Sequence, residues 1–347
     1  MASISIIMST ARDDYPILGL PETHIFDPLV RSLNKQTFKD FELVIVDSLY
    51  DDRDTSPLDD ATFHVNRVPP KPSPWLDLGM FHSANNFNTG LIHAEGELIV
   101  KIDDCMEIVN ENHLQRIWDL YNKGFTPLQT FMYYFKGKPA KYRKNLVKEI
   151  ISMGSFSEYG KSLLSGNWDG VYQKGEQIRD TRLNLFDTQT KTCTHKWYYG
   201  VSSVSLRNAL AVNGYDETMD GCRGLEDIDF GLRLELYGVN PFLIDKDLML
   251  IEHVNDELSK KVITRERRHF RNGYLLYYLH KINKRIQANK HILTDQEIEF
   301  IRTETINPTL PGAGRPLTRK YEYDPYLFDV WVKNQRTFDL QDLRFEA

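Results

Sequence analysis

The chain has 347 residues, of which 41% are hydrophobic and 27% are charged, with a formal net charge of −6 at pH 7. This is the composition of an ordinary folded protein, and its acidic balance argues against a nucleic-acid binder, whose surface is usually basic. The three cysteines, Cys105, Cys193 and Cys222, are widely spaced and imply neither a disulfide framework nor a zinc site. Because the N-terminus lacks a basic signal-peptide start and no apolar run reaches the length of a membrane span, we expect a cytoplasmic protein.

Three apolar runs in the first third of the chain, at residues 4–8, 41–46 and 97–102, predict β-strands. The runs are continuous rather than alternating, which is typical of strands that are covered on both faces in a parallel sheet. Helical spacing at residues 25–33 and a helical segment at about 78–94 separate the strands. This order predicts a Rossmann-like half.

The rest of the chain predicts a second half and an extension. We expect loops and short elements that line a groove at residues 125–196, where the sequence shows no clear period. The later elements are expected in the order strand then helix (together 196–210), helix (224–238), two short strands (241–245 and 247–254), a basic helical stretch (264–289) and a helix that opens with a capping box, Thr294 with Glu297. The helix at 224–238 should bury Leu225, Ile228, Leu232 and Leu236 on one face.

Polar residues end each of the first three strands. They are Thr10 with Arg12, then Asp47, and then the adjacent pair Asp103 and Asp104. Ligands of open α/β sheets bind beyond the carboxyl ends of the strands, so these residues predict a site at one edge. Two adjacent carboxylates call for a cation, and Mg²⁺ or Mn²⁺ takes oxygen ligands, although a solvated turn explains the pair equally well.

Three segments in order, SLNKQTFKDFELVIVDS, NTGLIHAEGELIVKIDDC and GLEDIDFGLRL, resemble the family 2 glycosyltransferases with the GT-A fold. The resemblance covers roughly residues 3–255. It implies an α/β fold with a Rossmann-like mixed sheet flanked by helices. The GT-A domain would span 1–255, with a nucleotide-sugar half at about 1–105 and an acceptor half at about 106–255. A mainly helical C-terminal extension would follow at 256–347.

The resemblance also implies a role for each motif residue. Nucleotide binding would fall to Thr10, Arg12, Asp47 and Asp103. Asp104 would hold the metal, Asp227 would be the catalytic base, and Glu226 would stand beside it at the acceptor.

The Glu226–Asp227 pair opens a predicted helix, where the helix dipole favours carboxylates whether or not they react. An acidic first turn is therefore the alternative explanation. A positioned aspartate can, however, take the proton of an attacking hydroxyl. Gly221 and Gly224 before the pair allow a tight loop that brings an acceptor close.

His253 follows an apolar run, and a lone histidine there is more often structural than a ligand. In the β-1,4-galactosyltransferases, which share the GT-A fold, a histidine after the Glu-Asp helix and the following strand completes the metal site, and this sequence is similar there. The resemblance thus implies that Asp104 and His253 hold Mn²⁺ or Mg²⁺. Imidazole suits Mn²⁺ better.

Two further segments bear on the acceptor. Trp197 and Tyr198, with Tyr199, precede the acceptor-side motif; core packing is the default for such rings, but they also suit the C–H face of a sugar. The basic stretch at 264–289 is most often a solvated helix face, and it also permits peripheral membrane contact that would suit a lipid-linked acceptor.

The chain departs from the family pattern at three places. Cys105 stands where the family commonly has a further aspartate, Phe87 stands where an arginine often precedes Asn-Thr-Gly, and Ser48 follows Asp47 where many relatives have a second aspartate. These departures bear on metal binding, on a phosphate contact and on recognition of the base, respectively.

The resemblance implies an inverting, metal-dependent glycosyltransferase of the hexosyltransferase type. It would move a sugar from a nucleotide-diphosphate donor, UDP-linked by family frequency, to a hydroxyl of a glycan or lipid-linked acceptor. A sugar-phosphate nucleotidyltransferase needs a glycine-rich loop after the first strand, and MSTARDDYP has no glycine. A non-catalytic module that binds a nucleotide sugar or a glycan stays open because of Cys105 and Phe87.

Overall fold

The computed structural model describes residues 2–11, 24–104, 106–135, 180, 182, 188–222, 224–254, 271–282, 284–307, 309 and 323–346. The side chains at 132–135, 253–254 and 281–282 lie outside this description. The chain forms two compact units. Unit 1 comprises Met1–Pro69, Ala94–Leu206 and Asn240–Ser259, and unit 2 comprises Pro70–His93, Arg207–Val239 and Lys260–Ala347.

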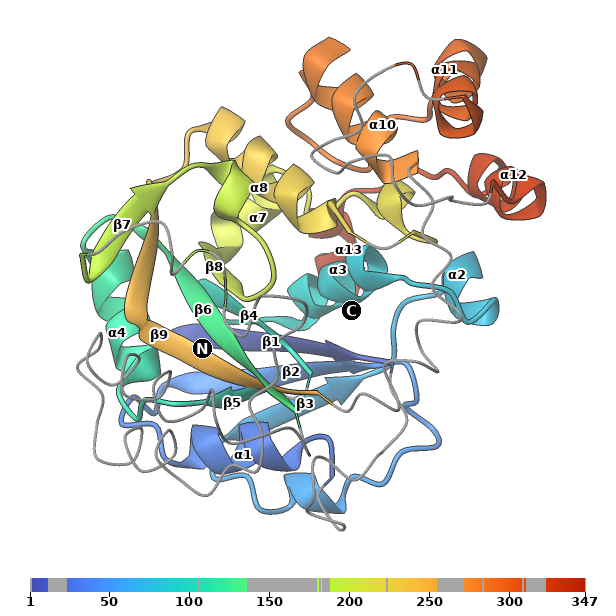
Figure 1. Cartoon of the computed structure of the whole chain (residues 1–347). Helices are drawn as coiled ribbons and strands as arrows, with labels where there is room; N and C mark the ends of the chain where they lie inside the picture. The colour runs from blue at the N-terminus through green and yellow to red at the C-terminus, as the bar shows by residue number, and fades with distance from the viewer. Residues whose placement is uncertain are drawn as a thin grey trace. The chain divides into compact units, whose positions relative to one another are not determined.

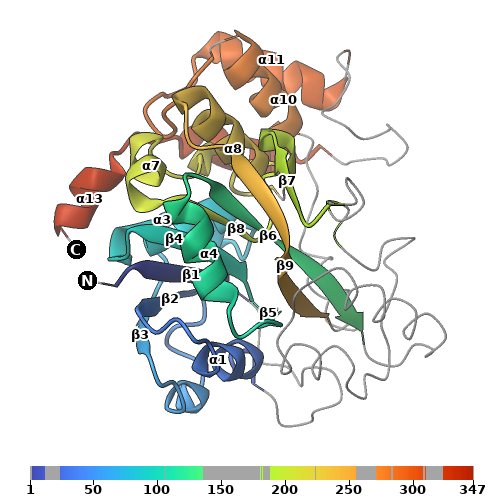
Figure 2. The same cartoon turned by 90° about the vertical axis from the view of Figure 1, so that its left-hand side faces the viewer.

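Unit 1 contains a mixed sheet (Figures 1 and 2) with the strand order β3-β2-β1-β4-β8-β6-β9-β5, and β7 pairs with β9. The strands β1 to β4 are parallel, β8 is antiparallel to its two neighbours, and β6 and β9 run parallel side by side. The strands are β1 (Ile4–Thr10), β2 (Phe41–Asp47), β3 (His64–Val68), β4 (Leu98–Asp103), β5 (Met106–Ile108), β6 (Thr126–Phe135), β7 (Thr190–Cys193), β8 (Ser202–Ser205) and β9 (Phe242–Val254).

The core of unit 1 lies between the sheet and two helices, α1 (Asp27–Asn34) and α4 (His113–Asn122). Each helix buries apolar residues at spacings of three and four, as an amphipathic helix should. The sheet contributes alternate residues of β1, so that one face of the strand meets the helices. These core residues are Leu29, Val30 and Leu33 of α1, Leu114, Ile117 and Leu120 of α4, and Ile4, Ile6 and Met8 of β1. Two short 3₁₀ helices, η1 (Ser56–Leu58) and η3 (His195–Trp197), lie in the connections.

Unit 2 is helical, and its core gathers around Trp75 and Trp331. The capping box predicted for residue 294 is present, because Thr294 N donates to Glu297 Oε2 (2.6 Å) and Glu297 N donates to Thr294 Oγ1 (3.4 Å). The helices are α2 (Pro74–Asp77), α3 (Ser83–His93), α7 (Leu206–Ala211, which begins in unit 1), η4 (Glu217–Met219), α8 (Glu226–Tyr237), α10 (Arg271–Tyr277), the π-helical η5 (Tyr278–Ile282), α11 (Asp295–Ile306), α12 (Pro325–Lys333) and α13 (Leu340–Glu346).

The fold class predicted from the sequence is confirmed: a Rossmann-like mixed sheet with flanking helices is followed by a mainly helical C-terminal region. The predicted domain boundary at 255/256 stays a prediction, and the contacts group the C-terminal region with residues 70–93 and 207–239. Strand β3 was not predicted, because its five residues are exposed or only partly buried and carry no apolar run. The two strands predicted at 241–254 form the single strand β9, in which Asp245 is buried and paired with Arg116 (2.8 Å).

The predicted apolar face of α8 is wrong. Leu236 is 47% exposed, and Ile228 and Leu232 are only partly buried. The helix instead turns a mixed face inward, consisting of Glu226, Asp229, Phe230, Gly231, Arg233 and Leu234. Charged residues can occupy a buried face when they neutralise each other, as Asp229 and Arg233 do here with an N–O distance of 2.7 Å.

Gly96, in the turn before β4, lies too close to β1 to accept a larger side chain. A Cβ on Gly96 would lie 2.4 Å from the backbone nitrogen of Ser5 in β1. Gly96→Ala should therefore lower the free energy of unfolding by about 1–3 kcal/mol or more, because backbone must move to admit the methyl group. Urea denaturation of the wild type and the variant would measure this loss.

Gly124→Ala is the matched control, because Gly124 has a φ of +85° but no heavy atom within 4 Å of an added Cβ. That variant should lose only about 1–2 kcal/mol, the cost of a left-handed conformation for a residue with a Cβ. A loss well below about 1 kcal/mol in Gly96→Ala would contradict the close approach of Gly96 to β1.

Candidate functional site

Parallel pairing brings the predicted nucleotide-side residues to one edge of the sheet in unit 1. Thr10 of β1 lies opposite Asp47 of β2, and Ser9 lies opposite Asp103 of β4. The hydroxyl of Thr10 donates to Asp104 Oδ2 over 2.9 Å, and both side chains are buried. The ends of β1 and β4 are thus joined by a hydrogen bond between two of the predicted residues.

The adjacent carboxylates Asp103 and Asp104 have different surroundings. Asp104 is buried, whereas the side chain of Asp103 is 44% exposed. Lys101 Nζ lies 2.9 Å from Asp103 Oδ1 and also donates to the carbonyl oxygen of Gly200 over 3.1 Å. A lysine of the same strand therefore supplies a positive charge beside the pair.

Asp47 is buried and holds two arginines. Its Oδ2 accepts from Arg53 Nε and Arg67 Nη2, each over 2.8 Å, and its Oδ1 accepts from the backbone N–H of Leu49. The guanidinium of Arg67 lies over the ring of Tyr50, 4.4 Å from its centroid. Sequence reasoning missed both arginines: Arg67 lies in β3, which has no apolar signal, and Arg53 lies in a segment that was predicted as loop.

Of the predicted acceptor-side aromatics, Tyr198 is a core residue. It is 1% exposed and packs against Phe242 with 5.1 Å between ring centroids. Trp197 is only partly buried, and its carbonyl oxygen accepts from Arg182 Nη1 over 3.1 Å. Trp197 is therefore the more accessible of the two residues to an acceptor.

Glu226 and Asp227 begin α8 in unit 2, directly after Leu225, whose φ is +76°. Asp227 is partly buried and Glu226 is 9% exposed. Asp229, the third carboxylate of this turn, is fully engaged: it is 2.7 Å from Arg233 Nη2 and 2.7 Å from His280 Nε2. Asp229 is thus a structural group, and Asp227 and Glu226 are the two carboxylates of this turn that remain candidates for chemistry.

Phe87 and Asn88, at the Asn-Thr-Gly segment, have packing roles in unit 2. The ring of Phe87 is buried against Tyr215 and Phe230, at centroid distances of 4.3 and 5.8 Å. Asn88 exchanges two hydrogen bonds with the backbone of Tyr215 and donates a third to Glu217 Oε1. Position 87 is therefore part of the hydrophobic core.

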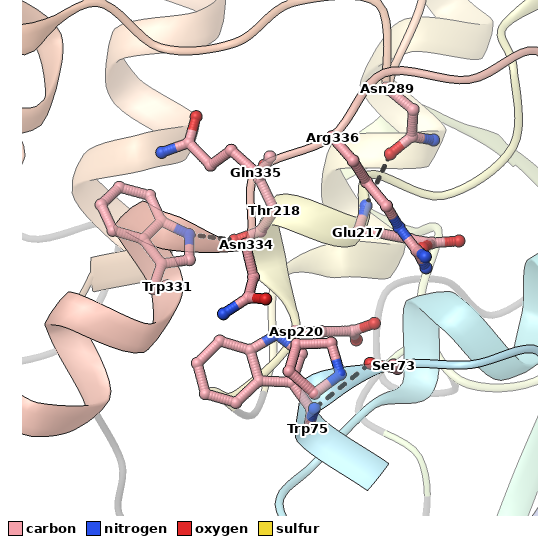
Figure 3. A pocket seen from close by; sticks show the side chains of 11 residues that line it. Ser73, Trp75, Glu217, Thr218, Asp220, Asn289, Trp331, Asn334, Gln335 and Arg336 are labelled. Atoms are coloured by element: carbon pink, nitrogen blue, oxygen red, sulfur yellow. Dashed lines mark hydrogen bonds and ion pairs between the residues drawn. The ribbon is translucent and has the colours of Figure 1, made fainter. Parts of the chain in front are cut away.

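A pocket of about 390 Å³, including its open mouth, lies in unit 2. Figure 3 shows the indoles of Trp75 and Trp331 at one side and Glu217 with Arg336 at the other. Asp220 at its wall accepts the backbone N–H groups of Ala84 and Asn85 at the start of α3, each over 2.9 Å. Burial raises the pKa of Asp220 well above its usual range, and the charge of Glu217 adds to the rise.

The predicted metal ligands are only partly described. Asp104 is placed as above, and His253 lies in β9 with its side chain outside the described part. Met106 pairs with Glu252, the residue before His253, so the backbones of β5 and β9 are neighbours at this point. Within the described residues, no group of three or more His, Cys, Asp or Glu side chains could hold a metal ion. Arg12 and Cys105 lie outside the described residues.

The basic stretch at 264–289 is described from residue 271, except for residue 283. Arg271, Tyr274 and Leu275 are buried in unit 2, so these three side chains do not form an outward face. Membrane contact through the remainder of the stretch stays a prediction. None of the helices in the described ranges is long and apolar enough to cross a membrane.

Comparison with known proteins gives structural matches alone. No protein-family model and no curated protein matches the chain. Among solved structures, the chain is similar to S. aureus TarS, a family 2 glycosyltransferase, with 15% identity and a TM-score of 0.43 over 88% of this chain and 43% of TarS. It is also similar to TarS 1–349 in complex with UDP-GlcNAc (14% identity, TM-score 0.48, 88% of this chain and 72% of the other). The chain thus spans less than half of the longer TarS chain. The TM-scores are below 0.5, so the ligands of TarS are not assigned to this chain.

The Asp229–Arg233 pair predicts a pH-dependent stability. Burial alone would raise the pKa of Asp229, but the charge of Arg233 and the hydrogen bond from His280 lower it to about 2, from a usual value of 3.8. A lowered pKa stabilises the fold above the unfolded value and loses that effect as the pH falls. About 2 kcal/mol should therefore be lost between pH 4 and pH 2.

Asp229→Asn tests this pair. At pH 7 the variant should lose about 3–5 kcal/mol, because it leaves Arg233 buried without its counter-charge. Near pH 2 the difference from wild type should shrink, as urea denaturation at the two pH values would show. Asp342→Asn, at an exposed position of α13, is the control and should have little effect. A difference that stays constant with pH would contradict the assignment.

Proposed function

We propose that this chain is a glycosyltransferase that uses a nucleotide-diphosphate sugar. The observation that carries the proposal is the hydrogen bond from Thr10 to Asp104. It joins two motif residues at the carboxyl ends of parallel strands, which is where open α/β sheets bind nucleotides. The ordered motif segments and the Glu226–Asp227 turn of α8 support the same reaction class.

On the donor side, the half-exposed Asp103 and the buried Thr10 are suited to bind the ribose and the diphosphate. Asp47 would contribute to nucleotide binding by holding Arg67 in place. The guanidinium of Arg67 and the ring of Tyr50 form a flat face beside Asp47. Asp104 and His253 would hold Mn²⁺ or Mg²⁺. The ion would supply Lewis-acid stabilisation of the charge on the leaving diphosphate.

On the acceptor side, Asp227 would take the proton of an acceptor hydroxyl as its oxygen attacks the anomeric carbon. The new carbon–oxygen bond forms while the bond to the diphosphate breaks on the opposite face, so the configuration inverts. The nucleotide diphosphate leaves with the bonding electrons. Glu226 and Trp197 would contact the acceptor, which we expect to be a glycan or a lipid-linked sugar.

A second candidate function is a non-catalytic module that binds a nucleotide sugar. Two observations favour it: Lys101 already lies beside Asp103, and Phe87 is a core residue at a position where relatives often have an arginine. Release of nucleotide diphosphate from a panel of nucleotide sugars, with the UDP-linked donors first, separates the two candidates. A module would bind a donor and release no product.

Two substitutions should divide the donor side from the acceptor side. Asp227→Asn keeps the shape of the residue and removes its basicity, so kcat should fall by about 10²–10⁴-fold while nucleotide affinity stays unchanged. Asp104→Asn should weaken binding of the nucleotide and of the metal together. Calorimetry with the nucleotide and a product-release assay measure both effects.

Glu235→Gln, at an exposed position of the same helix, is the control for a lost charge on α8. It should leave kcat within about twofold, since most exposed substitutions have small effects. Near-normal turnover in Asp227→Asn would refute the assignment of the base and leave Glu226 as the next carboxylate to test.

Metal binding gives a separate test. Activity should vanish in excess chelator and return with added Mn²⁺ or Mg²⁺, and His253→Ala should weaken Mn²⁺ binding by about 10-fold or more in a calorimetric titration. His64→Ala is the matched control, because the His64 side chain is 72% exposed on β3. Full activity in excess chelator would contradict the metal proposal, and unchanged Mn²⁺ affinity in His253→Ala would show that this histidine is structural.

A further inference from the structure

The loop before α8, described at residues 218–222 and 224–225, leads into Glu226 and Asp227, and side chains of the C-terminal region hold its backbone. Arg271 Nη2 donates to the carbonyl oxygens of Asp220 (2.5 Å), Thr218 (3.3 Å) and Met219 (3.4 Å). Trp331 Nε1 also donates to the carbonyl of Thr218 over 2.8 Å, a bond drawn in Figure 3.

Asn272 holds both ends of the same loop. Its Nδ2 donates to the carbonyl oxygen of Met219 over 2.9 Å and to that of Gly224 over 3.0 Å. One amide group thus fixes the distance between Met219, near the start of the loop, and Gly224, which lies three residues before Asp227. Asn272 is 2% exposed, so water does not readily replace these bonds.

Burial of the charged Arg271 side chain is energetically unfavourable, which indicates that its hydrogen bonds to the loop have a specific role. Arg271 is 3% exposed, and its guanidinium lies over the ring of Trp331, 4.7 Å from the centroid. Its hydrogen-bond acceptors are mainly backbone carbonyls, and burial lowers its pKa. Its Nε has no hydrogen-bond partner among the described residues. Buried charges and unsatisfied donors are unfavourable, so a simple packing role would be filled better by an apolar residue.

The backbone just before the carboxylates is left-handed at three residues and strained at one of them, Leu225. Gly221, Gly224 and Leu225 have φ values of +82°, +94° and +76°. A leucine in this conformation costs about 1–2 kcal/mol and persists only where its surroundings enforce it. A Cβ on Gly221 would meet the indole of Trp75 at 2.7 Å, so the loop is also confined from that side.

We infer that Asn272 and Arg271 are positioning residues that hold the loop before α8 at residues 218–220 and 224 and thereby set the place of Asp227 at the acceptor. This inference rests on the proposed function. The C-terminal region would then contribute to the acceptor side, because its side chains supply the hydrogen-bond donors that keep the loop in one conformation.

Asn272→Ala is the main test, because it removes both bonds and leaves the hydrophobic core unchanged. It should lower kcat by about 10–100-fold, the effect of a displacement of about 1 Å in a reacting group. Nucleotide affinity should stay unchanged, since the donor-side residues belong to unit 1. Hydrogen exchange of the amides at 220–228 should become faster, which is a readout independent of activity.

Arg271→Lys and Arg302→Lys form a matched pair. Both arginines lie over an aromatic ring, but Arg302 pairs with Glu299 of its own helix and makes no bond to the loop. Arg302→Lys should leave kcat and loop exchange unchanged. Arg271→Lys keeps the charge and part of the donor capacity, so its kcat should lie between those of the wild type and Arg271→Ala.

Each outcome decides a separate point. Unchanged exchange at 220–228 in Asn272→Ala would overturn the anchoring of the loop. Faster exchange with normal kcat would overturn the positioning of Asp227. If the wild type releases nucleotide diphosphate from no donor, the proposed function fails and the role in catalysis fails with it, whereas the exchange data still decide whether the loop is anchored.

Discussion

A buried carboxylate must have a donor, and this constraint organises both units. Asp47 is held by Arg53 and Arg67 at the end of β2, and Asp104 is held by Thr10 at the end of β1. In unit 2, Asp229 is held by Arg233 and His280. An unpaired carboxylate in these places would cost several kcal/mol. The bonds from Thr10 to Asp104, from Arg67 to Asp47 and from His280 to Asp229 also join segments that are distant in the sequence.

The same constraint separates structural carboxylates from those that can react. Asp47 and Asp229 are buried and have charged partners within 2.8 Å, so their charge is already balanced inside the protein. Asp103 is 44% exposed and Asp227 is only partly buried, so both side chains are accessible to solvent. This difference in exposure supports the proposal that Asp103 and Asp227 contact ligands.

The sequence predicts what depends on local pattern and misses what depends on distant partners. Strands β1, β2 and β4 and the start of α8 follow from continuous apolar runs and from the position of the acidic turn. Strand β3 carries no such pattern, so Arg67 could not be placed beside Asp47. The inward face of α8 was predicted wrongly because Arg233 and His280, which allow Asp229 to be buried, contribute nothing to an apolar period. The sequence also could not predict the contacts between the C-terminal region and the loop before α8. These are tertiary contacts, such as the hydrogen bond from Asn272 to Gly224.

The departures from the family pattern bear on how a diphosphate would be neutralised. Phe87 packs against Tyr215 and so offers no charge. Lys101 lies beside Asp103, so part of its charge is already balanced by a carboxylate. A leaving diphosphate carries more negative charge than a lysine in this position can offset. A divalent ion at Asp104 and His253 would supply the missing positive charge, so the proposed transfer would depend more strongly on the proposed metal than it would with an arginine at position 87.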